Sequence, residues 1–566
     1  MTFTNTFKYC LLVGTLLISS ISCTQTAPGK AAIATAHPLA TKAGMAILDQ
    51  GGNAFDAAVA VAAVLAVAEP YSSGLGGGGF WLLHDKKNNK DIMIDGREKA
   101  PLKAHRDLYL DKQGEPIKGI SLQGPLAAGI PGVPAAMVAI AQQYGKLPLK
   151  TSLAPAINVA KQGYRIDESY RLYAKLRLKA LQANEDAANI FLYQNDVPPK
   201  DYILKQPDLA KTLEQIAASG FNGFYSGDVA KNLVDGVQQA GGIWTHDDLD
   251  QYKIETRQPI QFNYRGHTIS SASPPSSGGI AMAEIFHILE SFDLDKLSAL
   301  EKKHIVVEAM RRAYADRATY LGDPDFVNVP VKRLTSQQHA EDWAKSIDLK
   351  AASKSETLGQ HSPTIGKGTD TTHYSIIDKE GNRVAATLSI NYPFGACFVA
   401  PGTGVLLNDE MDDFSAKPGV PNAYGLVGAE ANAIASGKRP LSSMSPTFVE
   451  SDKSLAIVGT PGGSRIITMV LLAVLNVIDN MNAEQIINAK RFHHQYLPDK
   501  IIYEHGAFTE KEIASLEKMG HSMKQQTSPY GGEGTYGNMQ LILWNKASNT
   551  LEAASDPRGH GLAIVR

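Results

Sequence analysis

The stretch Gly368-Thr369-Asp370-Thr371-Thr372-His373-Tyr374-Ser375 lies deep inside the chain and opens a strand-like run that ends at Ile377. A turn, Asp378-Lys379-Glu380-Gly381-Asn382, separates this run from a second one between Arg383 and Ile390. Two runs of this kind on either side of a glycine-containing turn predict a β-hairpin. Hydroxyl residues therefore gather at one end of the predicted hairpin.

Thr371 is the candidate nucleophile among these hydroxyl residues. A threonine hydroxyl needs a base beside it, and the residue's own free α-amine is one known solution. The nitrogen of an internal threonine is part of a peptide bond, so this chemistry requires cleavage of the chain between Asp370 and Thr371. On the hairpin alone, a hydroxyl-rich strand start without catalysis is the simpler interpretation.

Further motifs along the chain change that interpretation. Each is weak alone, but together and in order they closely resemble the gamma-glutamyltransferases, also called glutathione hydrolases. These are self-cleaving members of the N-terminal nucleophile hydrolase group, and the resemblance runs from about Gly29 to Arg558. Besides the Thr371 stretch, the motifs are Gly51–Ala58, Asp95-Gly96-Arg97-Glu98, Pro274–Gly279, Asn408-Asp409-Glu410-Met411-Asp412-Asp413-Phe414, Pro440-Leu441-Ser442-Ser443-Met444-Ser445-Pro446, Gly459–Arg465 and Ser555-Asp556-Pro557-Arg558.

The resemblance implies an α+β fold, a four-layer αββα sandwich in which two central sheets face each other. Both self-cleavage products build it together, so the chain forms a heterodimer of its own subunits. Periodicity alone indicates only a mixture of helices and strands. The expected division is a signal peptide at 1–22, a large subunit at 23–370 and a small, catalytic subunit at 371–566.

The resemblance also implies the reaction. Thr371 would attack the gamma-glutamyl amide of glutathione and related donors, and water or an amino-acid or peptide acceptor would resolve the gamma-glutamyl-enzyme. Ser389 stands where many relatives have a threonine that hydrogen-bonds the nucleophile. Gly462 and Gly463 match the oxyanion-hole glycines, whose N–H groups meet the developing charge. No cofactor or metal is implied.

A gamma-glutamyl donor presents an α-ammonium and an α-carboxylate, so its pocket needs charge of both signs. Arg97 matches the clamp for the carboxylate, where its planar fork suits two parallel hydrogen bonds. Tyr424 lies in a segment, Ser415–Gly425, that resembles the lid loop of the family and argues against lid-lacking branches such as cephalosporin acylases. The remaining expected pocket residues are Ser442 and Ser443 beside the carboxylate, and Asn391, Glu410 and Asp413 around the ammonium.

Two rival functions remain open. One is a binding protein that kept the gamma-glutamyl pocket without turnover, and intact Thr371, Asn391 and the Gly-Gly pair count against it. The other is an acylase or peptidase for a different acyl group, which the Arg97 and Asp413 pair disfavours. Two other candidate sites are disfavoured. The glycine run 74–79 precedes a strand, whereas the glycines of a dinucleotide-binding fingerprint follow a strand and open a helix. His493-His494 lacks a third ligand at metal spacing.

Bulk properties narrow the possible partners. The 566 residues carry a formal net charge of −2 and are 43% hydrophobic, as in ordinary globular enzymes. This balance gives no reason to expect nucleic acid as a partner. The length exceeds what one hydrophobic core usually serves.

The first residues predict export to the bacterial periplasm. Lys8 precedes the apolar run 10–18, and small residues follow, which is the order of a secretory signal peptide. Ser20-Ile21-Ser22-Cys23 resembles a lipoprotein cleavage box, so the protein is either anchored through a lipidated Cys23 or cut nearby and soluble. The chain has three cysteines, too few for a disulfide framework.

Overall fold

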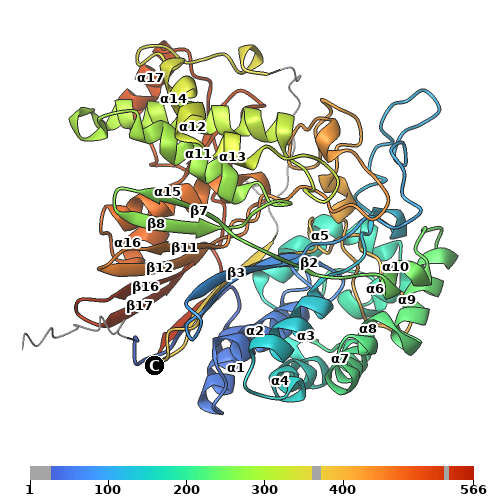
Figure 1. The fold of residues 1–566 in the computed structure, drawn as a ribbon. Helices are drawn as coiled ribbons and strands as arrows, with labels where there is room; N and C mark the ends of the chain where they lie inside the picture. The colour runs from blue at the N-terminus through green and yellow to red at the C-terminus, as the bar shows by residue number, and fades with distance from the viewer. Residues whose placement is uncertain (1–26, 360–370, 528–533) are drawn as a thin grey trace, which may run out of the picture.

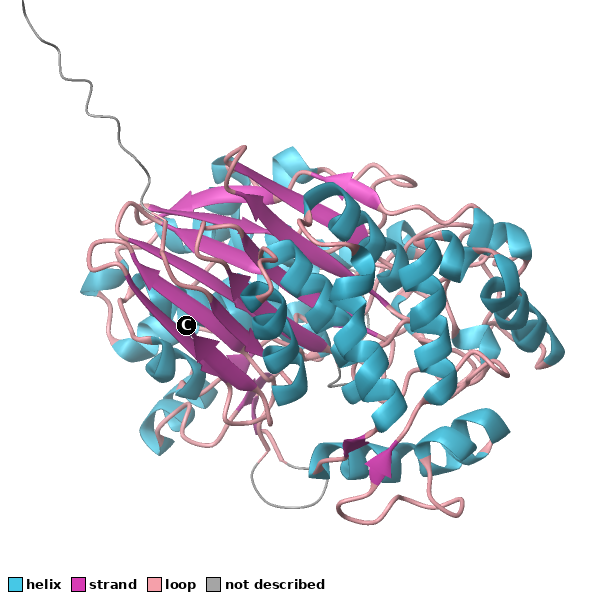
Figure 2. Cartoon of the chain, turned by 90° about the horizontal axis from the view of Figure 1, so that it is seen from below, coloured by secondary structure: helices cyan, strands magenta, loops and turns pink. Residues whose placement is uncertain are grey.

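The computed structural model describes residues 27–359, 371–527 and 534–566. It confirms the predicted α+β class and the four layers, with two antiparallel sheets face to face between two layers of helices (Figure 1). Figure 2 shows the same strands from below, flanked by helices.

The first sheet has seven strands and carries the predicted nucleophile. All neighbouring strands in it are antiparallel. Its order is β18 (Leu562–Val565), β1 (Ala32–Thr35), β9 (Thr372–Ile377), β10 (Arg383–Ser389), β2 (Gly78–Asp85), β3 (Lys90–Gly96) and β6 (Glu255–Arg257).

The second sheet has six strands, also antiparallel throughout. Its order is β17 (Thr550–Ser555), β16 (Gln540–Asn545), β12 (Ser454–Gly459), β11 (Thr447–Glu450), β8 (His267–Ser271) and β7 (Ile260–Tyr264). Two small sheets are formed by β4 (Tyr164–Arg165) with β5 (Ile203–Leu204), and by β13 (Phe492–His493), β14 (Ile501–Tyr503) and β15 (Met523–Gln525).

Helices cover the outer face of each sheet (Figure 1). On the side of the first sheet are α1 (Pro38–Asp49), α2 (Ala54–Ala68), α3 (Val133–Tyr144), α4 (Leu149–Gln162), α5 (Glu168–Gln182), α6 (Glu185–Phe191), α7 (Pro207–Ser219), α8 (Asn222–Tyr225), α9 (Gly227–Gln239) and α10 (His246–Asp250). On the side of the second are α11 (Gly278–Glu290), α12 (Ala299–Tyr320), α13 (Val331–Leu334), α14 (Gln337–Lys345), α15 (Ile466–Ile478), α16 (Ala483–Asn488) and α17 (Glu510–Lys518).

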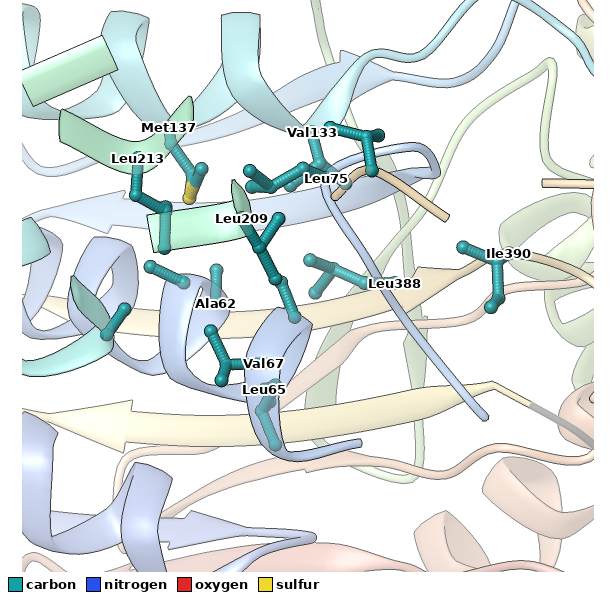
Figure 3. Close-up of a cluster of buried hydrophobic side chains, with 14 of the residues drawn as sticks. Ala62, Leu65, Val67, Leu75, Val133, Met137, Leu209, Leu213, Leu388 and Ile390 are labelled. Atoms are coloured by element: carbon teal, nitrogen blue, oxygen red, sulfur yellow. The ribbon is translucent and has the colours of Figure 1, made fainter. Parts of the chain in front are cut away.

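Apolar packing holds the layers together. Leu82 and Ile377 of the first sheet join Phe448 and Ile542 of the second in one buried cluster between the sheets. A larger cluster lies between the first sheet and its helices, where α2 is buried on all sides (Figure 3). Burial of this kind stabilises the fold by about 25 cal/mol for each Å² of apolar surface removed from water.

The start of α2 follows directly from its sequence. Asn53, the N-cap residue, accepts hydrogen bonds from the backbone N–H groups of Phe55 and Asp56, both at 3.0 Å. The Asp56 carboxylate reaches back to the Asn53 N–H at 2.9 Å, which completes a capping box.

The predicted hairpin is formed by β9 and β10. Their register pairs His373 with Thr387 and Thr372 with Leu388. Thr371 therefore lies immediately before β9, opposite the end of β10. Neither β1 nor β18 was predicted, although β1 pairs with β9 and β18 pairs with β1.

Several sequence predictions fall on residues outside the described ranges. These are the signal peptide at 1–22, Cys23 and Asp370. Within the described ranges, no helix is both long and apolar enough to cross a membrane. Cys397 is a buried free thiol.

Candidate active site

Thr371 is nearly buried, with 6% of its surface exposed. Its Oγ1 lies 3.3 Å from the Oγ of Ser389. The Ser389 oxygen also accepts the backbone N–H of Asn391 at 2.8 Å. With that N–H bound, Ser389 still has its proton and one acceptor position, so either hydroxyl of the pair can donate to the other. The two hydroxyls are therefore held in hydrogen-bonding range by the ends of neighbouring strands.

Thr371 opens onto a small pocket that gathers most of the predicted site. Its free volume is about 20 Å³, room for about one water molecule. Arg97 and Gly462 lie outside its lining, and Arg97 is immediately behind it. The lining consists of Thr371, Ser389, Asn391, Glu410, Asp413, Tyr424, Leu426, Ser442, Ser443, Met444, Gly463, Ser464 and Ile466.

Arg97 is fully buried and is paired with the acidic residues of the pocket. Its Nη1 lies 2.7 Å from Glu410 Oε2, and its Nη2 lies 2.5 Å from Asp413 Oδ2. The prediction assigned Arg97 to a substrate carboxylate and the two acids to an ammonium. In the structure Arg97 is paired with Glu410 and Asp413. A zwitterionic group could replace these ion pairs, with its carboxylate at Arg97 and its ammonium at the two acids.

Glu98 is a member of this charge cluster that the sequence reasoning did not single out. Its Oε2 lies 3.4 Å from Arg97 Nη1. Burial raises the pKa of Glu98 to about 7, against the opposing effect of the Arg97 charge. Burial likewise raises the pKa of Glu410 well above its usual range. The position of Glu98, immediately after Arg97 in a recognised motif, was the signal that could have identified it.

A second arginine, Arg317, supports the predicted pocket residues Ser442 and Ser443. Arg317, on α12, donates from Nη2 to Ser443 Oγ at 3.2 Å and from Nε to Ser277 Oγ at 3.0 Å. Ser277 Oγ in turn donates to the Ser442 carbonyl at 2.7 Å. The segment Pro274–Gly279 thus holds the serines in place. Nothing in the helical pattern of α12 distinguished Arg317 from a surface arginine, so the sequence reasoning missed it.

The Gly462-Gly463 pair adopts backbone conformations that other residues rarely take. Their φ angles are +143° and +56°, both in the region that favours glycine. A Cβ on Gly463 would lie 2.2 Å from Tyr424 Cδ1, so the tyrosine ring packs directly on the glycine. The Tyr424 hydroxyl donates to the Asn391 carbonyl at 2.7 Å. Tyr424 therefore lines the pocket and packs on Gly463, and its assignment to a lid stays a prediction.

A larger cavity of about 330 Å³ also meets Thr371. Its wall includes Glu69, Tyr173, Asn538 and His560. This volume is in the range of small-molecule sites. The predicted nucleophile therefore lies between a tight charged pocket and a larger cavity of mixed polar and apolar lining.

A family model for gamma-glutamyltranspeptidase matches residues 40–565. The chain belongs to the gamma-glutamyltranspeptidase family. The glutathione hydrolase proenzyme of Escherichia coli (strain K12) is 43% identical over 534 residues, covering 93% of this chain and 90% of that protein. The family predicted from the motifs is thereby confirmed.

Solved structures agree with this assignment. The cephalosporin acylase from Bacillus halodurans has a TM-score of 0.82 and 26% identity, and the match covers 100% of this chain and 99% of that one. The gamma-glutamyltranspeptidase of Helicobacter pylori has a TM-score of 0.56 and 40% identity, over 57% of this chain and 95% of that one. The four-layer fold is thus shared between acylase and gamma-glutamyltranspeptidase relatives.

Proposed function

We propose that this member of the gamma-glutamyltranspeptidase family transfers and hydrolyses gamma-glutamyl groups, with Thr371 as nucleophile. Glutathione and related gamma-glutamyl compounds would be donors, and water, amino acids or short peptides would be acceptors. The observation that carries the proposal is the position of the Thr371–Ser389 hydroxyl pair on a pocket that presents Arg97 together with Glu410 and Asp413.

Maturation would precede activity. Thr371 Oγ1 attacks the carbonyl carbon of Asp370, the peptide bond breaks and an ester forms. Water hydrolyses the ester, which leaves a carboxylate on Asp370 and a free amine on Thr371. The products are a large subunit, 23–370, and a small subunit, 371–566. The amine cannot act as base in this step, because it belongs to the bond being cut.

In the mature site the new amine would act as base. The pKa of an N-terminal amine is about 7.7–8.0, so a useful fraction is neutral near neutral pH. It accepts the Thr371 proton as the oxygen attacks the gamma-carbonyl, and the backbone N–H groups of Gly462 and Gly463 meet the oxyanion. The amine then protonates the leaving group, and water or an acceptor amine attacks the ester in the second half-reaction.

Donor binding would replace the ion pairs that Arg97 forms with Glu410 and Asp413. The α-carboxylate of the donor takes the Arg97 guanidinium, with Ser442 and Ser443 beside it. The α-ammonium takes Asp413 and Glu410. The carboxylate and the ammonium of the donor each pair with a protein charge of opposite sign. No buried charge is then left unpaired, and an unpaired buried charge would cost several kcal/mol.

We also propose that the protein is exported. Either residues 1–22 would be removed and Cys23 lipidated, or an ordinary cleavage nearby would give a soluble periplasmic protein. The apolar run that ends before the small residues at 19–22 supports export. Partition of the wild type with membranes, and release of Cys23→Ser, would separate the two outcomes.

The central test is the cut itself. The purified protein should run as two chains on a denaturing gel, and the smaller should begin Thr-Thr-His-Tyr. Thr371→Ala should remain a single chain and should not release the amine from a gamma-glutamyl anilide. A wild-type protein that is active as one full-length chain would contradict the proposal.

A further inference from the structure

Three helices on the outer face of the second sheet bring metal-ligand side chains together, away from Thr371. Glu284 on α11, Asp316 on α12 and His339 on α14 each place one ligand atom within 4.8 Å of the others. His339 Nε2 lies 2.6 Å from Asp316 Oδ2. Trp343 Nε1 donates to the same carboxylate oxygen at 2.8 Å, which orients it. Figure 1 shows these helices above the sheet.

Glu284 is the unusual member of this cluster. Only 1% of its surface is exposed, and within the described residues neither of its carboxylate oxygens has a hydrogen-bond partner. A buried carboxylate without a partner is costly. Burial and the neighbouring Asp316 both raise the pKa of Glu284. Two carboxyl groups this close need either a shared proton or a cation between them.

We propose that Glu284, Asp316 and His339 bind a divalent cation of the zinc class. Imidazole nitrogen and carboxylate oxygen are ligands that zinc takes, and three protein ligands leave one position for water. The hydrogen bond from Trp343 to Asp316 is the kind of outer contact that orients a metal ligand. The cation would neutralise the two carboxylates and join α11, α12 and α14.

A second cluster of similar composition provides a contrast. His304, Glu308 and His521 also lie within 4.8 Å of one another. Their polar atoms are already engaged: His304 contacts His521 and the Asp348 carbonyl, both at 2.8 Å. Glu308 is paired with two arginines of the same helix, at 3.3 Å and 2.6 Å. Because those cations already balance its charge, this cluster needs no metal, whereas Glu284 forms no ion pair with any residue that the structure describes.

The cation would also brace the helix behind the candidate active site. Asp316 is followed by Arg317, whose side chain contacts Ser443. Fixing Asp316 therefore restrains the turn of α12 that supports the serine pair. The cation takes no part in the proposed reaction, so its binding can be tested independently of turnover.

The test uses the full purified protein, stripped of metal with a chelator and titrated with Zn²⁺ by calorimetry. The wild type should bind one zinc at this site per pair of large and small subunits and should melt at a higher temperature with zinc. Glu284→Gln should weaken that binding at least tenfold. Glu290→Gln, an exposed carboxylate on the same helix, should leave it unchanged.

A second variant separates the loss of zinc binding from a folding defect in Glu284→Gln. His339→Gln is at the partly exposed side of the cluster and should also lose the zinc-induced rise in melting temperature. Visible absorption of added Co²⁺ should disappear in the same variant. If wild type, Glu284→Gln and His339→Gln bind zinc equally, the proposal is wrong. It is also overturned if zinc has no effect and Glu284→Gln raises the melting temperature in chelator, the result expected of a shared proton.

Discussion

The hydroxyl of Thr371 lies 3.3 Å from the hydroxyl of Ser389, across the open end of the β9–β10 hairpin. The two residues are 18 positions apart in the sequence, and the antiparallel register alone brings them together. Ser389 is held from its other side by the Asn391 N–H. The proposed nucleophile thus contacts a hydroxyl that is anchored to the backbone.

Removal of that hydroxyl should slow maturation. Ser389→Ala leaves Thr371 without its oriented neighbour, and a hydrogen bond of this kind contributes about 0.5–1.5 kcal/mol. We expect self-cleavage to slow about two- to tenfold, measured by the appearance of the small subunit on denaturing gels. Ser389→Thr keeps the hydroxyl and should cleave at the wild-type rate or faster. Equal rates for Ser389→Ala and wild type would exclude this role.

Arg97→Lys should weaken donor binding while leaving maturation intact. Lysine keeps the charge but loses the planar fork, and losing a charge-assisted hydrogen bond costs about 1.5–3 kcal/mol. The kcat/KM for a gamma-glutamyl anilide should fall roughly ten- to hundredfold. Self-cleavage involves no substrate and should proceed normally. Loss of self-cleavage together with activity would indicate that Arg97 is needed for folding rather than for the donor.

Asp413→Asn should reduce the preference for donors that carry an α-ammonium. The comparison is kcat/KM for a gamma-glutamyl anilide against the same anilide acylated with glutaric acid, which lacks the amine. Wild type should prefer the amine-bearing donor, and the variant should lose most of that preference because the counter-charge is gone. An unchanged preference would mean that Asp413 does not contact the ammonium.

Asp412 offers a matched control for that experiment. Its carboxylate is directed elsewhere, to the Ser121 hydroxyl at 2.7 Å and the Ala423 N–H at 2.9 Å. Asp412→Asn removes the same charge one residue away, so it should affect both donors alike. A selective effect of Asp412→Asn would show that the preference depends on overall charge rather than on one contact.

The buried His373 should make the protein less stable in acid. Burial lowers its pKa from 6.5 to about 3. Between these values the unfolded chain binds the proton and the folded protein does not, so the free energy of unfolding falls as the pH drops. This one group contributes about 1.4 kcal/mol per pH unit in that window.

The check on His373 is the pH dependence of the denaturant midpoint between pH 6.5 and 4. In His373→Gln the fall should be shallower by about one proton. Glutamine can still hydrogen-bond Thr387 Oγ1, which lies 2.8 Å from His373 Nδ1. The exposed His246→Gln should behave like wild type. Parallel curves for His373→Gln and wild type would contradict the expectation.

Local patterns predicted much of the fold. The β9–β10 hairpin, for example, depends on residues close together in the chain. The motifs also identified Thr371, Asn391 and Gly463 as members of one predicted site, and these residues line one pocket. Sequence reasoning succeeded where the interaction partner lies within a turn or a hairpin.

Tertiary structure decided the features that join distant segments. The strand β1 was not predicted because its four residues become a strand only by pairing with β9 and β18, each more than 300 residues away. Arg97 meets Asp413 across a separation of 316 residues. The apolar pattern of α11 did not identify Glu284 as a candidate ligand. Only the packing of α12 and α14 against α11 brings Glu284 near Asp316 and His339. Such charges and strands acquire their partners only when the layers pack, because burial and pairing are properties of the assembled core.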